Sequence, residues 1–144
     1  MAEVIQKVDY FYIETPDKPG EGARVLKALQ EAGVNLLAFT GFPHGRKAQI
    51  DFIPEDTAAF KAAAKKAKLK LSPKKTGFLV KGEDRVGALV SIVEKLAEAG
   101  INITAMDAVT AGEGRYGAIF WVKPADIRKA ERVLGLSTPQ VSGQ

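Results

Sequence analysis

An internal repeat constrains this 144-residue chain more than any other feature, because it requires one fold to be built twice. The letters DKPG begin the first copy at residue 17, and DRVG begin the second at residue 84. A helical pattern follows each, and then EAGVNL from residue 31 or EAGINI from residue 98, at a constant offset of 67. Further on the offset is 70, which pairs Pro54 with Pro124 and indicates three extra residues around 111–114. The length and the repeat together predict two small domains, residues 1–72 and 73–144.

Each copy shows the same order of predicted elements. Residues 8–14 and 76–81 are rich in β-branched and aromatic side chains and are expected to be the first strands. Next come an amphipathic helix, two strands joined by a turn, and a second helix. Gly33 and Gly100 are expected to end the first helix of each copy, and Pro54 and Pro124 to begin the second. The last strands are expected at residues 69–71 and 139–141.

This order predicts an α+β protein made of two ferredoxin-like βαββαβ units. In such a unit the strands form an antiparallel sheet, and both helices cover one of its faces. A unit of this size buries a thin core, so we expect pairing between copies or chains.

The composition excludes several kinds of chemistry. The chain has no cysteine and one histidine, His44, so disulfides, thiolate metal sites, a cysteine nucleophile and a multi-histidine metal site are all excluded. His44 is expected at a hairpin tip without an activating partner. We therefore predict no catalytic residue, metal or cofactor, and a protein that is not an enzyme.

The N-terminal sequence and the lack of a long apolar run predict a cytoplasmic protein. The N-terminus, MAEVIQKVDYFYIE, does not resemble a signal peptide, and no run of about 18 apolar residues could span a membrane. The net charge of +4 is local, because seven lysines and no acid lie between residues 61 and 75. These lysines are expected to form the solvated face of the second helix, with contact to an anionic partner surface as the alternative.

The duplicated pattern D-[KR]-x-G, a helix, and E-A-G-[VI]-N-[LI] resembles the ACT domain, a small ligand-binding regulatory module that often senses amino acids. The resemblance covers nearly the whole chain and implies two ACT repeats without a catalytic domain. It departs locally at Val86, where a proline is usual, and at Gly22, where a leucine is usual. It also implies an effector held at an interface between two domains, by the loop after the first strand and the start of the second. The positions that correspond are Asp17, Lys18, Pro19, Gly20, Asn35, Asp84, Arg85, Gly87 and Asn102.

The chemistry of these positions suits a free amino acid. Unpaired N–H groups at a helix N-terminus favour a carboxylate, and a glycine lets the ligand approach the backbone closely. Asp17 and Asp84 could accept hydrogen bonds from an ammonium group, and an asparagine side chain offers both a donor and an acceptor. Structural roles remain open, since aspartate before a helix is a common N-cap, asparagine is common in turns, and Lys18 and Arg85 could simply be solvated.

We therefore expect an amino-acid-binding regulatory protein, a homodimer, whose output passes to a separate metabolic enzyme. The alternative is a dimerisation or docking module without a ligand. RNA binding is less favoured: the RNA recognition motif has the same element order, but the aromatic residues of RYGAIFWV (115–122) fall at the wrong positions. No nucleic-acid or membrane partner is expected.

Overall fold

The computed structural model describes residues 3–136, and these divide into two compact units. The first-repeat unit is Asp9–Lys75. The second-repeat unit begins at Thr76 and also contains the start of the chain up to Val8. The sequence-based division at residue 72 assigned that N-terminal segment to the first repeat, whereas its contacts in the structure are with the second.

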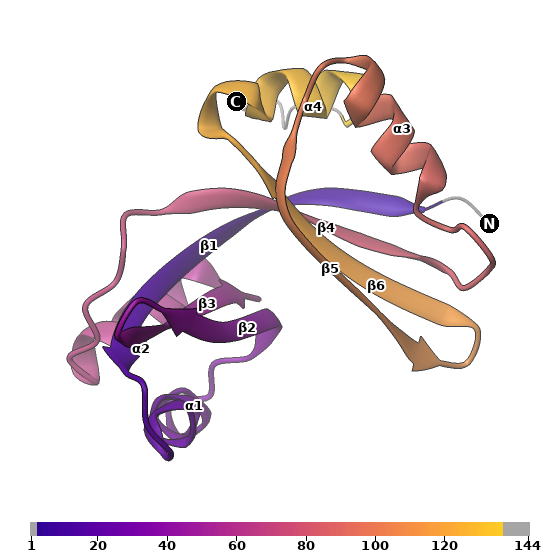
Figure 1. The fold of residues 1–144 in the computed structure, drawn as a ribbon. Helices are drawn as coiled ribbons and strands as arrows, with labels where there is room; N and C mark the ends of the chain where they lie inside the picture. Colours follow the sequence, from indigo (N-terminus) through magenta and orange to yellow (C-terminus); the bar gives the residue numbers. More distant parts are fainter. Residues whose placement is uncertain (1–2, 137–144) are drawn as a thin grey trace. The chain divides into compact units, whose positions relative to one another are not determined.

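The first-repeat unit is a three-stranded antiparallel sheet with two helices (Figure 1). The strand order is β2-β3-β1. Its elements are β1 (Val4–Pro16, which begins in the other unit), α1 (Glu21–Glu31), β2 (Leu36–His44), β3 (Lys47–Pro54) and α2 (Thr57–Lys66).

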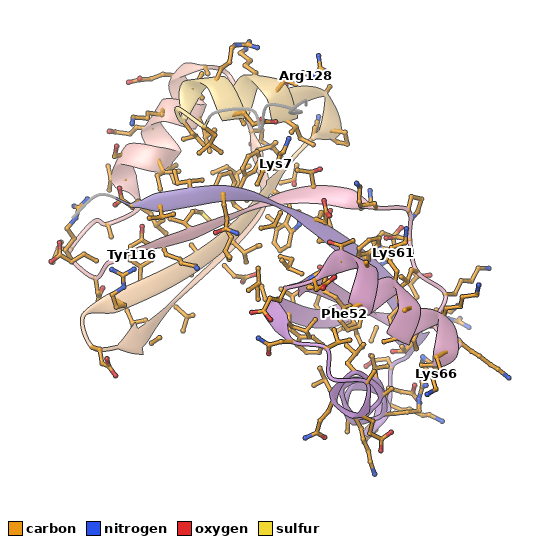
Figure 2. All side chains as sticks on the ribbon, turned by 180° about the vertical axis from the view of Figure 1, so that it is seen from behind. Lys7, Phe52, Lys61, Lys66, Tyr116 and Arg128 are labelled. Carbon is orange, nitrogen blue, oxygen red and sulfur yellow. The ribbon has the colours of Figure 1, made fainter. Side chains whose placement is uncertain are left out.

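Side chains from one face of this sheet and from both helices form the core of the first-repeat unit. Phe52 of β3, which is fully buried, lies 5.3 Å from Phe60 of α2 between ring centroids (Figure 2). Val25 and Leu29 of α1 join the same cluster. Because both helices contribute to it, they cover the same face of the sheet, as the βαββαβ order predicts.

The second-repeat unit repeats this architecture. Its strand order is β1-β4-β6-β5, so the first residues of β1 provide an edge strand. The other elements are β4 (Lys75–Glu83), α3 (Val90–Glu98), β5 (Ile103–Gly112), β6 (Arg115–Val122), the 3-10 helix η1 (Pro124–Asp126) and α4 (Ile127–Val133). Figure 1 shows α3 and α4 on the same side of β4, β5 and β6.

An ion pair attaches the N-terminal strand to the second-repeat unit. The Nζ atom of Lys7 on β1 lies 3.2 Å from Oε2 of Glu131 on α4. The Glu131 side chain is only 7% exposed. Together with the pairing of β1 with β4 and the packing of Ile5 on the core, this contact joins the start of the chain to residues after 76.

Strand register shows where the three extra residues of the second repeat lie. Phe11 is opposite Phe52 and Phe78 is opposite Phe120, so the offset along the third strand of each repeat is 68. Only one extra residue is therefore in the 111–114 hairpin, and the other two follow β6, where η1 has been added. The expected pairing of Pro54 with Pro124 is wrong for the strands: Pro54 ends β3, and only Pro124 begins a helical turn.

The expected strand at residues 69–71 is wrong. The segment contributes two partly buried leucines to the core, but its neighbour Ser72 makes the contacts with β1, donating its N–H to the carbonyl of Tyr12 at 2.9 Å. Pro73 follows and has no N–H, so a regular ladder cannot continue. The other expected last strand, 139–141, lies outside the described residues.

The helix ends agree with the sequence. Gly33 and Gly100 follow α1 and α3 with φ of 73° and 74°, and the residue after each returns a hydrogen bond to the helix, as the predicted C-terminal motif requires. Among residues 3–136, no helix is long and apolar enough to cross a membrane.

Candidate functional site

The two motif loops lead into α1 and α3 with similar backbone geometry. Gly20 and Gly87 have φ of 94° and 70°, a left-handed conformation that favours glycine. Neither Asp17 nor Asp84 caps a helix with its side chain: the N-cap residues are Gly20 and Leu89, and no side-chain capping bond is present at either helix. Both carboxylates are exposed and lie in the loops.

Within one repeat, the loop and the asparagine of the motif lie at opposite ends of a helix. Gly20 precedes the 11-residue helix α1 and Asn35 follows it. Eleven residues of helix span about 16 Å, which is too far for one small ligand to touch both. The same holds for Gly87 and Asn102 around α3.

The loop before α3 borders an open hollow of about 350 Å³, which we call the α3 hollow. Its walls are Asp84 and Gly87–Val90 from the loop and helix start, Ala108–Thr110 from β5, and Tyr116 from β6. All of these residues belong to the second-repeat unit. The structure thus brings two predicted residues, Asp84 and Gly87, to one concave surface.

The backbone of this loop leaves donors available to a ligand. Ala88 and Val90 donate their N–H groups to the carbonyls of Arg85 and Gly87, at 3.1 Å and 3.0 Å. In the described part of the chain, the N–H groups of Gly87 and Leu89 donate to no backbone carbonyl. A helix start with unused N–H groups favours an anion.

Tyr116 adds a buried polar group to the α3 hollow. Its side chain comes from β6 and belongs to the core beneath α3, where the residue is only 6% exposed (Figure 2). Its hydroxyl oxygen has no hydrogen-bond partner among residues 3–136. Burial raises the pKa of this hydroxyl; the Glu3 carboxylate raises it further, and Arg85 lowers it.

Gly82 makes room for the Tyr116 ring. A Cβ atom at position 82 would lie 2.6 Å from Cε1 of Tyr116, closer than carbon atoms can approach. Tyr116 lies outside the duplicated motif, within RYGAIFWV (115–122). The register between β4 and β6, which places Tyr116 opposite Gly82, was the signal that could have identified it.

A second hollow, of about 790 Å³, lies at the other end of the helix in the first-repeat unit. Asn35 lines it, together with residues of α1 such as Leu26, Lys27 and Gln30. The backbone carbonyl of Asn35 accepts a hydrogen bond from the N–H of Glu55 at 3.0 Å, which anchors the start of β2. No residue of the 17–20 loop lines this hollow.

The remaining predicted residues lie on exposed surface. Lys18 and Pro19 are exposed in the loop before α1, and Asn102 is exposed after α3. Arg85 places Nη2 3.4 Å from Oε2 of Glu3, so it interacts with the N-terminal segment of its own unit. That contact supplies a structural role for Arg85.

A buried carboxylate on the helix-free face of the first-repeat sheet was not predicted. Asp51 of β3 is 6% exposed and accepts hydrogen bonds from Oγ1 of Thr40 at 2.7 Å and Nε2 of Gln49 at 3.0 Å. Burial, and then the Asp51 carboxylate and Tyr12, raise the pKa of Tyr10 to about 12.

The positions of the other candidate groups argue against the rival chemistries. Phe120, like Tyr116, faces the helix-covered core and has no exposed surface on which a base could stack. His44 lies at the end of β2, with Nδ1 3.6 Å from Oε2 of Glu14. The lysines at 61, 65, 66, 68, 70 and 74 are exposed, as expected for a solvated face, and Figure 2 labels Lys61 and Lys66 on α2.

Comparison with known proteins agrees with this architecture. The family model for the ACT domain matches residues 77–135. No curated protein matches the sequence.

Three solved structures illustrate the shared fold. Protein BT0572 from Bacteroides thetaiotaomicron aligns with a TM-score of 0.77 at 18% identity, covering 91% of this chain and 88% of that one. The ligand-free regulatory subunit of aspartate kinase from Thermus thermophilus aligns with a TM-score of 0.62 at 18% identity, covering 94% and 96%. The regulatory subunit of aspartate kinase from Thermus flavus gives 0.57 at 19% identity, covering 93% and 94%.

These alignments span both repeats, whereas the family match lies in the second. The first-repeat unit has the same order of elements around the same motif, with its final strand replaced by the irregular segment 69–72. The second repeat therefore contains an ACT domain, and the first repeat has the same order of elements around the same motif.

Proposed function

We propose that this protein is a regulatory module that binds a free amino acid and passes the signal to a separate enzyme. The observation that carries this proposal is the α3 hollow, where Asp84 and Gly87 of the motif loop border a concave surface at the start of a helix. Unused N–H groups there suit a carboxylate, and Asp84 suits an ammonium group. No catalytic role is proposed for any residue.

The output to a separate enzyme is supported by the neighbouring structures. Two of them are regulatory subunits of aspartate kinase, and this chain covers nearly their whole length. A ligand acts on such a module only through a difference in its affinity for two arrangements of the domains. Because the loop and the asparagine lie about 16 Å apart within one repeat, Asn35 or Asn102 would contact the ligand only from another ACT domain.

A thermal-shift screen of the twenty amino acids, followed by calorimetry, tests the proposal. At 100 times Kd, a specific ligand adds about 2.7 kcal/mol to the free energy of unfolding. The repeat provides a matched pair of variants: Asp84→Asn should weaken binding, whereas Asp17→Asn should not. If calorimetry detects no binding of any amino acid, the sensing function is wrong.

A ligand-free dimerisation module is the second candidate, favoured by the edge strand of the first-repeat sheet. On β2, Leu37, Phe39 and Phe42 are 37%, 40% and 44% exposed, and no charged side chain interrupts residues 36–43. Exposed apolar edge strands tend to pair with other strands. A stable dimer by analytical ultracentrifugation, with no response to any amino acid, would favour this candidate over sensing.

A further inference from the structure

We infer that the α3 hollow takes an amino acid with an aliphatic side chain. This inference rests on the proposed function and specifies the ligand class for that site. The evidence is the lining of the hollow, the buried hydroxyl of Tyr116, and the differences between the two repeats.

The lining of the hollow is mainly apolar. Leu89, Val90 and Val109 border it together with two alanines, and Val109 is 70% exposed on the rim. A volume of about 350 Å³ is at the small end of the range for ligand sites. The apolar surface of a compact hydrocarbon side chain would be removed from water by contact with these groups.

The charges of the lining argue against polar side chains. Among the described residues, Asp84 is the only charged one in the lining. The nearby Arg85 is paired with Glu3 at 3.4 Å, so an acidic ligand side chain would find no unpaired cation in the lining. A basic one would compete with the ligand's own ammonium group for the single carboxylate of Asp84.

Tyr116 indicates that the hollow is built to receive a polar group as well. A buried hydroxyl without a partner is unfavourable in a folded protein, and buried polar groups are nearly always satisfied. The Tyr116 hydroxyl is such a group, and Tyr116 is one of the residues that line the hollow. The carboxylate of an amino acid bound at the start of α3 would supply an acceptor for it.

The first repeat lacks these features at the equivalent positions. The pair Gly82 and Tyr116 in the second repeat is equivalent to the pair Thr15 and Ala48 in the first, so the first repeat has neither the buried ring nor the glycine beneath it. Val109 corresponds to Phe42, whose ring replaces a small wall residue. The aliphatic site is thus a property of the second repeat.

Calorimetry on the full chain tests the inference with L-valine, L-leucine, L-aspartate, L-lysine and L-phenylalanine as probes. We expect L-valine or L-leucine to bind at least tenfold more tightly than the other three. Val109→Asp places a carboxylate on the exposed rim and should weaken aliphatic binding at least tenfold. Phe42→Asp, the matched change in the first repeat, should leave it unchanged.

Tyr116→Phe tests the hydroxyl separately, because it keeps the ring over Gly82 and the fold. We expect three- to tenfold weaker binding of the aliphatic amino acid, and amide NMR shifts at Gly87 and Val90 when it is added to the unmodified protein. Tighter binding of L-aspartate, L-lysine or L-phenylalanine, or aliphatic binding unaffected by Val109→Asp, would overturn the inference and leave amino-acid sensing intact. Absence of binding by all twenty amino acids would instead remove the proposed function, and this inference with it.

Discussion

The ion pair between Lys7 and Glu131 should stabilise the second-repeat unit. Lys7 lies on β1, about 70 residues before the rest of its unit, and Glu131 lies on α4. The two side chains approach to 3.2 Å but differ in exposure, at 37% for Lys7 and 7% for Glu131. Removing Lys7 therefore leaves a buried carboxylate, whereas removing Glu131 leaves a lysine that is partly exposed to water.

The difference in exposure between the two side chains determines how much unfolding free energy each variant loses. Lys7→Met leaves the Glu131 carboxylate buried without its cation, and we expect a loss of about 2 kcal/mol. Glu131→Gln leaves a lysine that can turn toward water, so a loss of about 1 kcal/mol is expected. The double variant should lose less than the sum of the two, because the interaction is removed only once.

Urea unfolding followed by tryptophan fluorescence measures these losses. Trp121 is the only tryptophan in the chain and lies on β6 of the same unit. With a slope of about 2 kcal/mol/M, Lys7→Met should lower the midpoint by about 1 M. Lys81→Met, which alters an exposed lysine on β4, is the control and should change it little. A larger loss in Glu131→Gln than in Lys7→Met would refute the reasoning, and so would additive losses.

Three further predictions follow from single contacts. Tyr10 has a pKa of about 12, so it keeps its proton between pH 10 and 12 in the folded state but loses it in the unfolded state. Stability should therefore fall as the pH rises through this range, and Tyr10→Phe should flatten that fall in urea titrations. Asp56→Ala should lower the free energy of unfolding by about 1 kcal/mol, because the Asp56 carboxylate accepts a hydrogen bond from the N–H of Ala59 at 3.0 Å. Asp126 makes no capping bond, so Asp126→Ala should change it very little in the same urea titration. Phe52→Ala should cost about 3–5 kcal/mol in thermal or urea unfolding, since it empties a fully buried position; a loss below 1 kcal/mol would contradict the assigned core.

The sequence predicted the elements that depend on local patterns. The left-handed glycines at 33 and 100 and the hairpins follow from turn chemistry, and the structure has each of them. Of the apolar residues predicted for one face of α3, Ile92 and Leu96 are buried, whereas Val93 is 38% exposed. The repeat made these predictions stronger, because each element had to appear twice.

Features that depend on contacts between distant segments could not be predicted in this way. Nothing in the composition of residues 4–8 shows that they belong with the second-repeat unit, whereas the structure pairs β1 with β4 and joins Lys7 to Glu131 of α4. Similarly, an offset counted along the sequence placed all three extra residues in one hairpin, whereas strand register divides them between the hairpin and the segment after β6.

The candidate site illustrates the same limit for function. The motif predicted Asp84 and Gly87 because they belong to a contiguous loop, and these are the two that line the α3 hollow. Asn102 belongs to the same motif but lies beyond the far end of α3. Proximity in a motif therefore does not place residues in one site when a helix of nine residues separates them.

Comparing equivalent positions in the two repeats shows which residues the fold requires. Some equivalent positions hold the same residue type in both copies. Phe52 and Phe120 lie in the two cores, and Gly33 and Gly100 have the same left-handed backbone conformation. The pair Tyr116 and Gly82 has no such counterpart, and a buried hydroxyl without a partner does not stabilise a core. Because the first repeat forms its sheet without that pair, the fold does not require it, and we propose that it serves ligand binding at the α3 hollow.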